Sequence, residues 1–165
     1  MSTFDPERLI KTLARHYVRY VLIGAVAARL QGFPRMTADT DITPAPDREN
    51  IERLAAALRD LEARVYTESV PEGLPFDISA ETLARARAWN LVTDAGRVDI
   101  AFEPSGTGGY EDLACSAVRF KVFEIEIQAA SLADILRCKE AADRPQDRQD
   151  AIVLREMLRA RGKDR

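Results

Sequence analysis

Arg35-Met-Thr-Ala-Asp-Thr-Asp-Ile-Thr43 carries the most informative pattern in this chain. Asp39 and Asp41 stand one residue apart and are followed by β-branched residues, which favour strands. Alternate residues of a strand face the same side, so both carboxylates would project into one space, about 7 Å apart along the backbone. Like charges this close require cations or protons between them, which indicates a divalent-metal site. Taken alone, the pattern also fits a solvated turn ahead of Pro44.

The composition is that of a globular protein. The chain has 165 residues, 46% of them hydrophobic and 31% charged, and we expect one domain over residues 1–165. It has no apolar run near the roughly 20 residues that span a bilayer, so no membrane partner is expected. Cys115 and Cys138 lack metal-ligand spacing and predict reduced thiols in a cytoplasmic protein. The net charge of −3 argues against a general nucleic-acid-binding surface.

Turn residues and hydrophobic periodicity divide the first half of the chain into alternating helices and strands. Asp5-Pro6 predicts the N-cap and the first position of a helix. Residues 20–23 predict a buried strand that ends at Gly24, and residues 25–30 predict a short helix. Asp47 predicts the cap of a longer helix.

The second half predicts a hairpin, further strands and a terminal pair of helices. In chain order we expect irregular backbone at 66–79, a short helix at 79–87, a hairpin of strands at 89–93 and 97–102, a flexible loop at 105–109, one or two strands within 117–129, and helices at about 131–145 and 147–159. The predicted class is therefore α/β (α+β), with a mixed twisted sheet flanked by helices and two helices at the C-terminal end.

Gly24 lies where the predicted strand turns directly into a predicted helix. Such a turn points free backbone N–H groups at whatever lies beyond the strand end, which suits a phosphate. Glycine also lets a ligand approach the backbone because it has no side chain. The same residues fit close packing of a helix on a strand, without any ligand.

Two later segments hold further candidate residues. Asp99 alternates with apolar neighbours in a predicted strand, so it either faces water or, if the sheet places it beside Asp41, completes a two-metal site. Lys139 lies on a predicted helix near a helix break and suits a polyphosphate as a mobile point charge. A solvated surface explains Lys139 equally well.

In this order, the pieces resemble the DNA polymerase beta-like nucleotidyltransferase superfamily. Its pattern is a Gly at a strand–helix turn, an Asp-x-Asp on the next strand and a third Asp on a later strand, as at Gly24, Asp39-Thr-Asp41 and Asp99 here. The chain is similar to the small bacterial subgroup that includes AbiEii-type abortive-infection toxins. Arg-x-Thr-x-Asp-x-Asp, which begins here at Arg35, is typical of that subgroup, and so is the late segment from Lys139 to Asp150.

The resemblance implies a role for each matching residue. Asp39, Asp41 and Asp99 would hold two Mg²⁺ ions, with Mn²⁺ as an alternative, and Asp99 would help to activate the acceptor. Gly24, with Ala25 and the following N–H groups, would hold the triphosphate, and Lys139 would contact the nucleotide phosphates. Arg35 and Thr37 would support the Asp strand or contact the nucleotide. Asp147 or Asp150 would position Lys139 or the acceptor.

The implied function is transfer of a nucleoside monophosphate, or of several nucleotides, from an NTP to an acceptor hydroxyl with release of pyrophosphate. A small molecule, a protein or an RNA could be the acceptor, and an antitoxin is an expected partner if the chain is the toxin of a toxin–antitoxin system. One departure matters, because Ala25 stands where many active members have Ser. The first alternative is therefore a catalytically silent nucleotide-binding or protein-interaction module with the same fold. A two-metal phosphodiesterase or nuclease ranks lower, and it remains open because carboxylate clusters serve hydrolysis equally well.

Overall fold

The computed structural model describes residues 3–163, so the two residues at each end of the predicted domain, 1–2 and 164–165, lie outside the described residues. Its helices are α1 (Pro6–Arg15), α2 (Gly24–Leu30), α3 (Arg48–Asp60), α4 (Ala80–Leu83), α5 (Tyr110–Cys115), α6 (Leu132–Ala142) and α7 (Pro145–Lys163). Its strands are β1 (Tyr20–Ile23), β2 (Asp39–Pro44), β3 (Arg64–Thr67), β4 (Val70–Leu74), β5 (Ala88–Thr93), β6 (Gly96–Ala101), β7 (Val118–Val122) and β8 (Ile125–Ala129).

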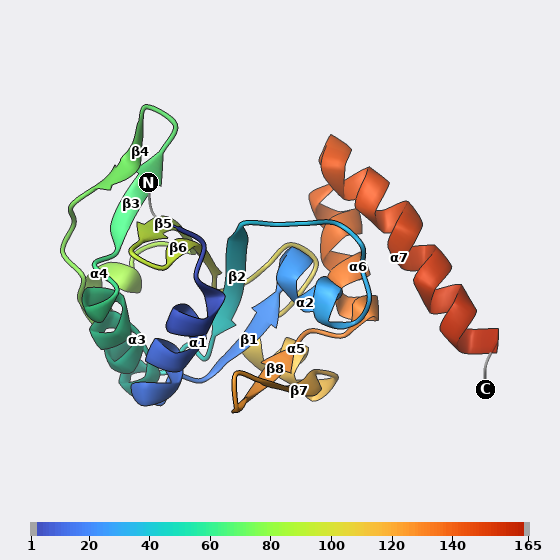
Figure 1. The fold of residues 1–165 in the computed structure, drawn as a ribbon, viewed down its shortest axis with the longest axis horizontal. Coiled ribbons are helices and arrows are strands. Elements are labelled where there is room, and N and C mark those ends of the chain that lie inside the picture. Colours follow the sequence, from blue (N-terminus) through green and yellow to red (C-terminus); the bar gives the residue numbers. More distant parts are fainter. Residues whose placement is uncertain (1–2, 164–165) are drawn as a thin grey trace.

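All of these strands join one mixed sheet, in the order β4-β3-β5-β6-β2-β1-β8-β7 (Figure 1). The central strand β2 pairs antiparallel with β1 and parallel with β6, two strands that are far apart in the chain. Helices lie against the sheet, and α6 and α7 form a pair beyond the C-terminal strand (Figure 1). The predicted α/β (α+β) class, with a mixed sheet and two C-terminal helices, is confirmed.

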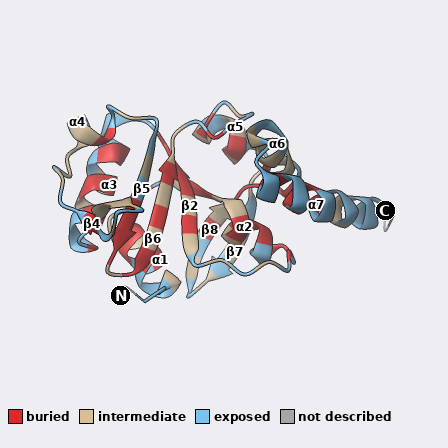
Figure 2. Ribbon diagram, turned by 90° about the horizontal axis from the view of Figure 1, so that it is seen from above, coloured by how far each residue is buried: buried red, intermediate tan, exposed pale blue. Residues whose placement is uncertain are grey.

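The two faces of the central strands differ in character. On one face the paired residues Leu22, Ile42 and Ile100 are almost fully buried, and they belong to the same hydrophobic cluster as α1 and α3. Because side chains alternate along a strand, Asp41 and Asp99 lie on the opposite face. Burial concentrates in these strands, whereas α7 is exposed along much of its length (Figure 2).

Helix capping follows the sequence closely. Asp5 accepts a hydrogen bond from the Arg8 backbone N–H at 3.0 Å, and Asp47 accepts one from Asn50 at 3.1 Å. Ser131 accepts one from Asp134 at 3.1 Å and begins α6. No helix among residues 3–163 combines the length and hydropathy needed to cross a bilayer.

The expectation of irregular backbone at residues 66–79 is wrong for its first part. There β3 and β4 form an antiparallel hairpin, with a register shift between Val65 and Thr67. Pro71 is tolerated because β4 is an edge strand, where a missing donor costs little. Gly73 is required, because it takes a φ of +92° and an added Cβ would come within 2.5 Å of Arg64 Cβ. The helix expected at 79–87 is only α4, and α5 was not expected at all.

Residues 105–109, expected to be a flexible loop, are held against α6. The Thr107 N–H and hydroxyl both donate to the Pro104 carbonyl, at 3.1 and 2.9 Å. Gly106, with φ of +75°, lies so close to α6 that an added Cβ would come within 2.8 Å of Ala141 Cβ. This packing brings the segment after β6 toward the C-terminal helices.

Candidate functional site

The acidic residues of the sequence motif gather on one face of neighbouring strands. Asp41 on β2 is paired in register with Asp99 on β6, and Asp39 with Arg97. These side chains share a face because they alternate along their strands. Parallel pairing of β2 with β6 therefore brings together carboxylates that are about sixty positions apart in the chain.

Gly24 adjoins the same carboxylates. Its neighbour Ile23 is paired with Asp41, and Gly24 takes a φ of +66°, a conformation that residues with a side chain rarely adopt. A Cβ at Gly24 would overlap the Asp41 carboxylate, so the contact requires glycine. No side chain caps the start of α2, which leaves its first N–H groups without a side-chain acceptor.

The pKa of Asp41 is strongly displaced. Burial raises it from the ordinary 3.8 to about 7, with further raising by the negative charges of Asp99 and Asp39. Lys139 and Arg144 act in the opposite direction. Burial also raises the pKa of Asp99, Arg97 lowers it and Asp39 raises it. Burial, and for Asp41 also the neighbouring carboxylates, therefore disfavours the charged form of both acids.

Lys139 belongs to a charge network between α6 and α7, in which Lys139, Asp147 and Asp150 are largely buried and Arg144 is largely exposed. Its Nζ lies 3.1 Å from Asp147 Oδ1 and 3.1 Å from Asp150 Oδ2. Arg144 Nε donates to Asp147 at 2.7 Å, and Arg35 Nη2 donates to Asp150 at 3.0 Å. Burial would raise the pKa of Asp147, but the hydrogen bonds from Arg144 and Lys139 outweigh it and hold that pKa below its usual range. Asp147 and Asp150 thus fix Lys139 in place.

A cavity of about 220 Å³ joins the acidic strand to this network. Its polar wall consists of the Gly24 turn, Asp41, Lys139, Arg144 and Asp147. The rest of its wall is formed by Ile23, Ala101, Pro104, Ser105, Ala130, Ile135, Cys138 and Ala142. Cations from the C-terminal helices therefore face a carboxylate and a glycine turn across a space that is half apolar.

The predicted residues do not all reach this cavity. Asp39 and Asp99 lie beside it on the sheet, and Ala25 is buried at 6% exposure. Thr37 supports the acidic strand, because its hydroxyl accepts a hydrogen bond from the Asp39 N–H at 3.2 Å. Arg35 joins the charge network by its hydrogen bond to Asp150, but it does not line the cavity.

The sequence reasoning missed Arg97 and Cys138 and gave Arg144 no role of its own. Arg97 could have been found, because Arg97-Val-Asp99 alternates in the same way as Asp39-Thr-Asp41 and so puts Arg97 on the acidic face. Arg144 could have been found from its spacing of three to Asp147 at a helix start. No signal in the sequence singles out Cys138.

The carboxylates suit a hard cation such as Mg²⁺. Asp99 Oδ1 is buried without a hydrogen-bond partner, as expected of an atom whose partner is a ligand. Within residues 3–163, however, no three His, Cys, Asp or Glu side chains are already arranged around one metal position. Arg97 stands among the acids instead, 3.7 Å from Asp39 Oδ2 and 3.7 Å from Asp99 Oδ1. The donor chemistry fits the ion, and Arg97 stands between two of the three donors.

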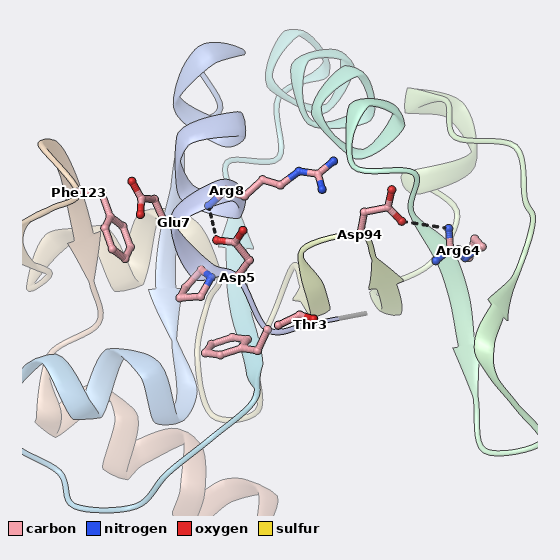
Figure 3. A pocket seen from close by; sticks show the side chains of 9 residues that line it. Thr3, Asp5, Glu7, Arg8, Arg64, Asp94 and Phe123 are labelled. Carbon is pink, nitrogen blue, oxygen red and sulfur yellow. Dashed lines mark hydrogen bonds and ion pairs between the residues drawn. The ribbon is translucent and has the colours of Figure 1, made fainter. Parts of the chain in front are cut away.

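A larger hollow, of about 800 Å³, lies elsewhere, around the start of α1 (Figure 3). It is lined by both acids and bases, including Asp5, Arg8 and the pair Arg64–Asp94, whose charged atoms are 3.7 Å apart. Asp39, Asp41, Asp99 and Lys139 do not line it. Size alone therefore does not identify the candidate site, and the grouping of charges does.

Comparisons with known proteins identify the fold. The lincosamide antibiotic adenylyltransferase LnuA, solved with lincomycin bound, aligns with a TM-score of 0.61 and 14% identity over 95% of this chain and 99% of its own. The antibiotic-resistance factor ANT(2'')-Ia aligns with a TM-score of 0.50 and 17% identity over 96% of this chain and 91% of its own. The Thermotoga maritima protein TM1012 aligns with a TM-score of 0.48 and 16% identity over 99% and 98%.

No protein-family model matches the chain, and no curated protein matches it in sequence. At these identities the structural similarity shows the fold, which is that of nucleotidyltransferases, as the sequence predicted.

Proposed function

We propose that this chain is a Mg²⁺-dependent nucleotidyltransferase that uses an NTP as donor. The observation that carries the proposal is the pairing of Asp41 with Asp99 beside the Gly24 turn, in a cavity whose other wall holds Lys139 and Arg144. A polyphosphate needs cations and free N–H groups, and the reacting phosphorus needs carboxylate-held metal ions nearby. This cavity brings residues suited to both needs within the reach of one ligand.

In the proposed reaction, the acceptor oxygen forms a bond to the α-phosphorus and the bond to the leaving pyrophosphate breaks. Lys139 and Arg144 bind the phosphates and stabilise the charge that grows on the leaving group. Asp147 and Asp150 hold Lys139 at a fixed position. Asp99 accepts the proton of the acceptor hydroxyl on the carboxylate oxygen that does not bind metal. Mg²⁺ bound by Asp39, Asp41 and Asp99 would neutralise phosphate charge and lower the pKa of that hydroxyl.

The acceptor that we favour is a hydroxyl group of a small molecule. LnuA, which shares the fold over nearly its full length, is an adenylyltransferase of lincosamide antibiotics. The net charge of −3 also disfavours a polyanionic RNA acceptor. A protein side chain and an RNA 3′ end are the competing acceptors in the assay below.

A toxin role is the second part of the proposal. The two segments typical of AbiEii-type toxins are in contact here, since Arg35 donates to Asp150 in the network that holds Lys139. A toxin would slow growth when expressed alone, and a partner protein would restore growth. Normal growth with active enzyme would exclude the toxin role and leave the transferase activity standing.

One observation favours the catalytically silent alternative. The residue after Gly24 is Ala25, so the turn offers no side-chain hydroxyl to a phosphate oxygen. The silent module would bind nucleotide and release no pyrophosphate. The transferase proposal instead requires that backbone N–H groups, Lys139 and Arg144 suffice to hold the triphosphate.

The test measures pyrophosphate release and label transfer from each α-labelled NTP with Mg²⁺, using the full chain. The acceptors are lincosamides and aminoglycosides, short RNAs, and bacterial protein extracts. Asp41→Asn and Asp99→Asn should abolish transfer, whereas Asp94→Asn, a surface acid on the β5–β6 turn, should not affect it. Binding of NTP without pyrophosphate release for any acceptor would support the silent module and refute the transferase.

A further inference from the structure

Arg97 occupies an unusual place in the acidic cluster. It lies on β6, paired in register with Asp39 and two positions before Asp99. Its guanidinium is 3.7 Å from one oxygen of each of these acids. The guanidinium carbon also lies 3.8 Å from the centre of the Tyr66 ring, within the range of a cation–π interaction. Arg97 thus stands where a bound cation would be shared by the two carboxylates.

The contacts of Arg97 with the acids are loose. A separation of 3.7 Å attracts opposite charges but is too long for a hydrogen bond. Arg97 Nε and Asp99 Oδ1 are both buried and have no hydrogen-bond partner. Buried polar atoms without partners are rare in folded proteins and usually indicate a missing ligand or a second arrangement. The ring of Tyr66, 3.8 Å from the guanidinium carbon, supports the guanidinium from a third side.

We propose that Arg97 is a built-in counter-ion of the acidic cluster that a divalent cation must displace, so that Arg97 sets the metal affinity of the site. The inference rests on the metal site of the proposed function. Without metal, the guanidinium offsets part of the repulsion among Asp39, Asp41 and Asp99. When the ion enters, the guanidinium remains on Tyr66 and leaves the two carboxylate oxygens to the metal. Arg97 is therefore a positioning residue, because it acts through the metal-binding carboxylates.

The first test is a titration of the full chain with Mn²⁺ in the absence of nucleotide, with the free ion measured by electron paramagnetic resonance. Arg97→Gln removes the competing charge and should tighten Mn²⁺ binding by about tenfold, since the ion no longer displaces a cation from the acids. Arg97→Lys keeps the charge and should bind Mn²⁺ about as the wild type does.

The chain offers a matched control in Arg64. This residue is 30% exposed, compared with 32% for Arg97, and its own ion pair, with Asp94, is also 3.7 Å long. Arg64→Gln removes the same charge away from the acidic cluster and should leave Mn²⁺ affinity unchanged. Equal tightening in both variants would show a general effect of net charge and would overturn the proposal.

The remaining outcomes separate this inference from the proposed function. Mn²⁺ binding that is lost in Asp41→Asn but is unchanged or weaker in Arg97→Gln would refute only the role of Arg97. Absence of Asp41-dependent binding in both wild type and Arg97→Gln would refute the metal site as well.

A second measurement covers the case in which Arg97→Gln does not fold. In the wild-type ¹⁵N spectrum, the Nε–Hε signal that Arg97→Lys lacks should shift when Mg²⁺ saturates the protein. An unmoved signal at saturating Mg²⁺ would overturn the displacement.

Discussion

The raised pKa of Asp41 predicts that this carboxylate destabilises the metal-free protein. The folded-state pKa is about 7 and the ordinary value is 3.8. A difference of this size corresponds to an upper limit of about 4 kcal/mol, at about 1.36 kcal/mol for each pH unit. Because the folded-state pKa lies above the unfolded one, the cost is fully present above pH 7, falls as the pH drops toward 4, and is absent below that.

The perturbation that tests this cost is Asp41→Asn, which keeps the size of the side chain and removes its charge. We expect the free energy of unfolding of the variant to exceed that of the wild type by about 2–4 kcal/mol at pH 8, by less than half of that at pH 5, and by little at pH 4. Urea denaturation at several pH values, without divalent ions, measures the difference. Added Mg²⁺ should stabilise the wild type and leave the variant unchanged, because only the wild type retains the full site.

Asp112→Asn provides a control, because the pKa of Asp112 is lowered where that of Asp41 is raised. The Gly108 N–H donates to Asp112 and holds its pKa below the usual range, so this substitution should not raise stability at neutral pH. A gain in Asp41→Asn that is the same at pH 4 and pH 8 would refute the electrostatic reasoning, and so would a loss of stability at pH 8.

Three further outcomes are expected. Asp147→Ala should lower the free energy of unfolding by about 3 kcal/mol and slow nucleotide transfer, because it removes an acid that is 1% exposed and one of the two partners of Lys139. Urea denaturation and the transfer assay measure the two effects. Gly24→Ala should cost at least about 1 kcal/mol and abolish NTP binding by calorimetry. Gly162→Ala, in open space at the end of α7, should stabilise by less than about 1 kcal/mol. Burial raises the pKa of the Cys138 thiol to about 11, so its alkylation at pH 8 should be slower than that of the exposed Cys115. NTP with Mg²⁺ should slow the alkylation of Cys138 further, because Cys138 lines the cavity, and mass spectrometry measures both rates.

Local patterns in the sequence predicted the elements that carry the candidate site. The alternation of Asp39 and Asp41 predicted a strand with both acids on one face, and the Gly24 turn predicted the break between β1 and α2. These predictions succeeded because strand periodicity and turn chemistry depend on adjacent residues. The N-caps Asp5 and Asp47 succeeded for the same reason.

Other features depend on contacts between distant segments, and the sequence did not reveal them. Nothing in the residues near Asp99 states that β6 lies parallel to β2 or which residue meets Asp41. Pro71 and Gly73 predict a break in the chain, but the place of β4 at the sheet edge accommodates Pro71, and the close approach of Arg64 and Val92 requires Gly73. The contact of Arg35 with Asp150 spans more than a hundred positions of the chain.

The strands at the two edges of the sheet bear on how this protein meets other molecules. Along β4, Pro71 has no N–H and Gly73 leaves the extended conformation with φ of +92°, so this edge offers no continuous hydrogen-bond ladder. At the other edge, β7 presents the exposed side chains of Arg119 and Lys121, which are paired with Glu126 and Glu124, and charged side chains on an edge strand discourage the addition of another strand. Addition of a ninth strand, the route to amyloid-like stacking and to many dimers, is disfavoured on both sides. Self-association, where it occurs, would then involve helices and loops.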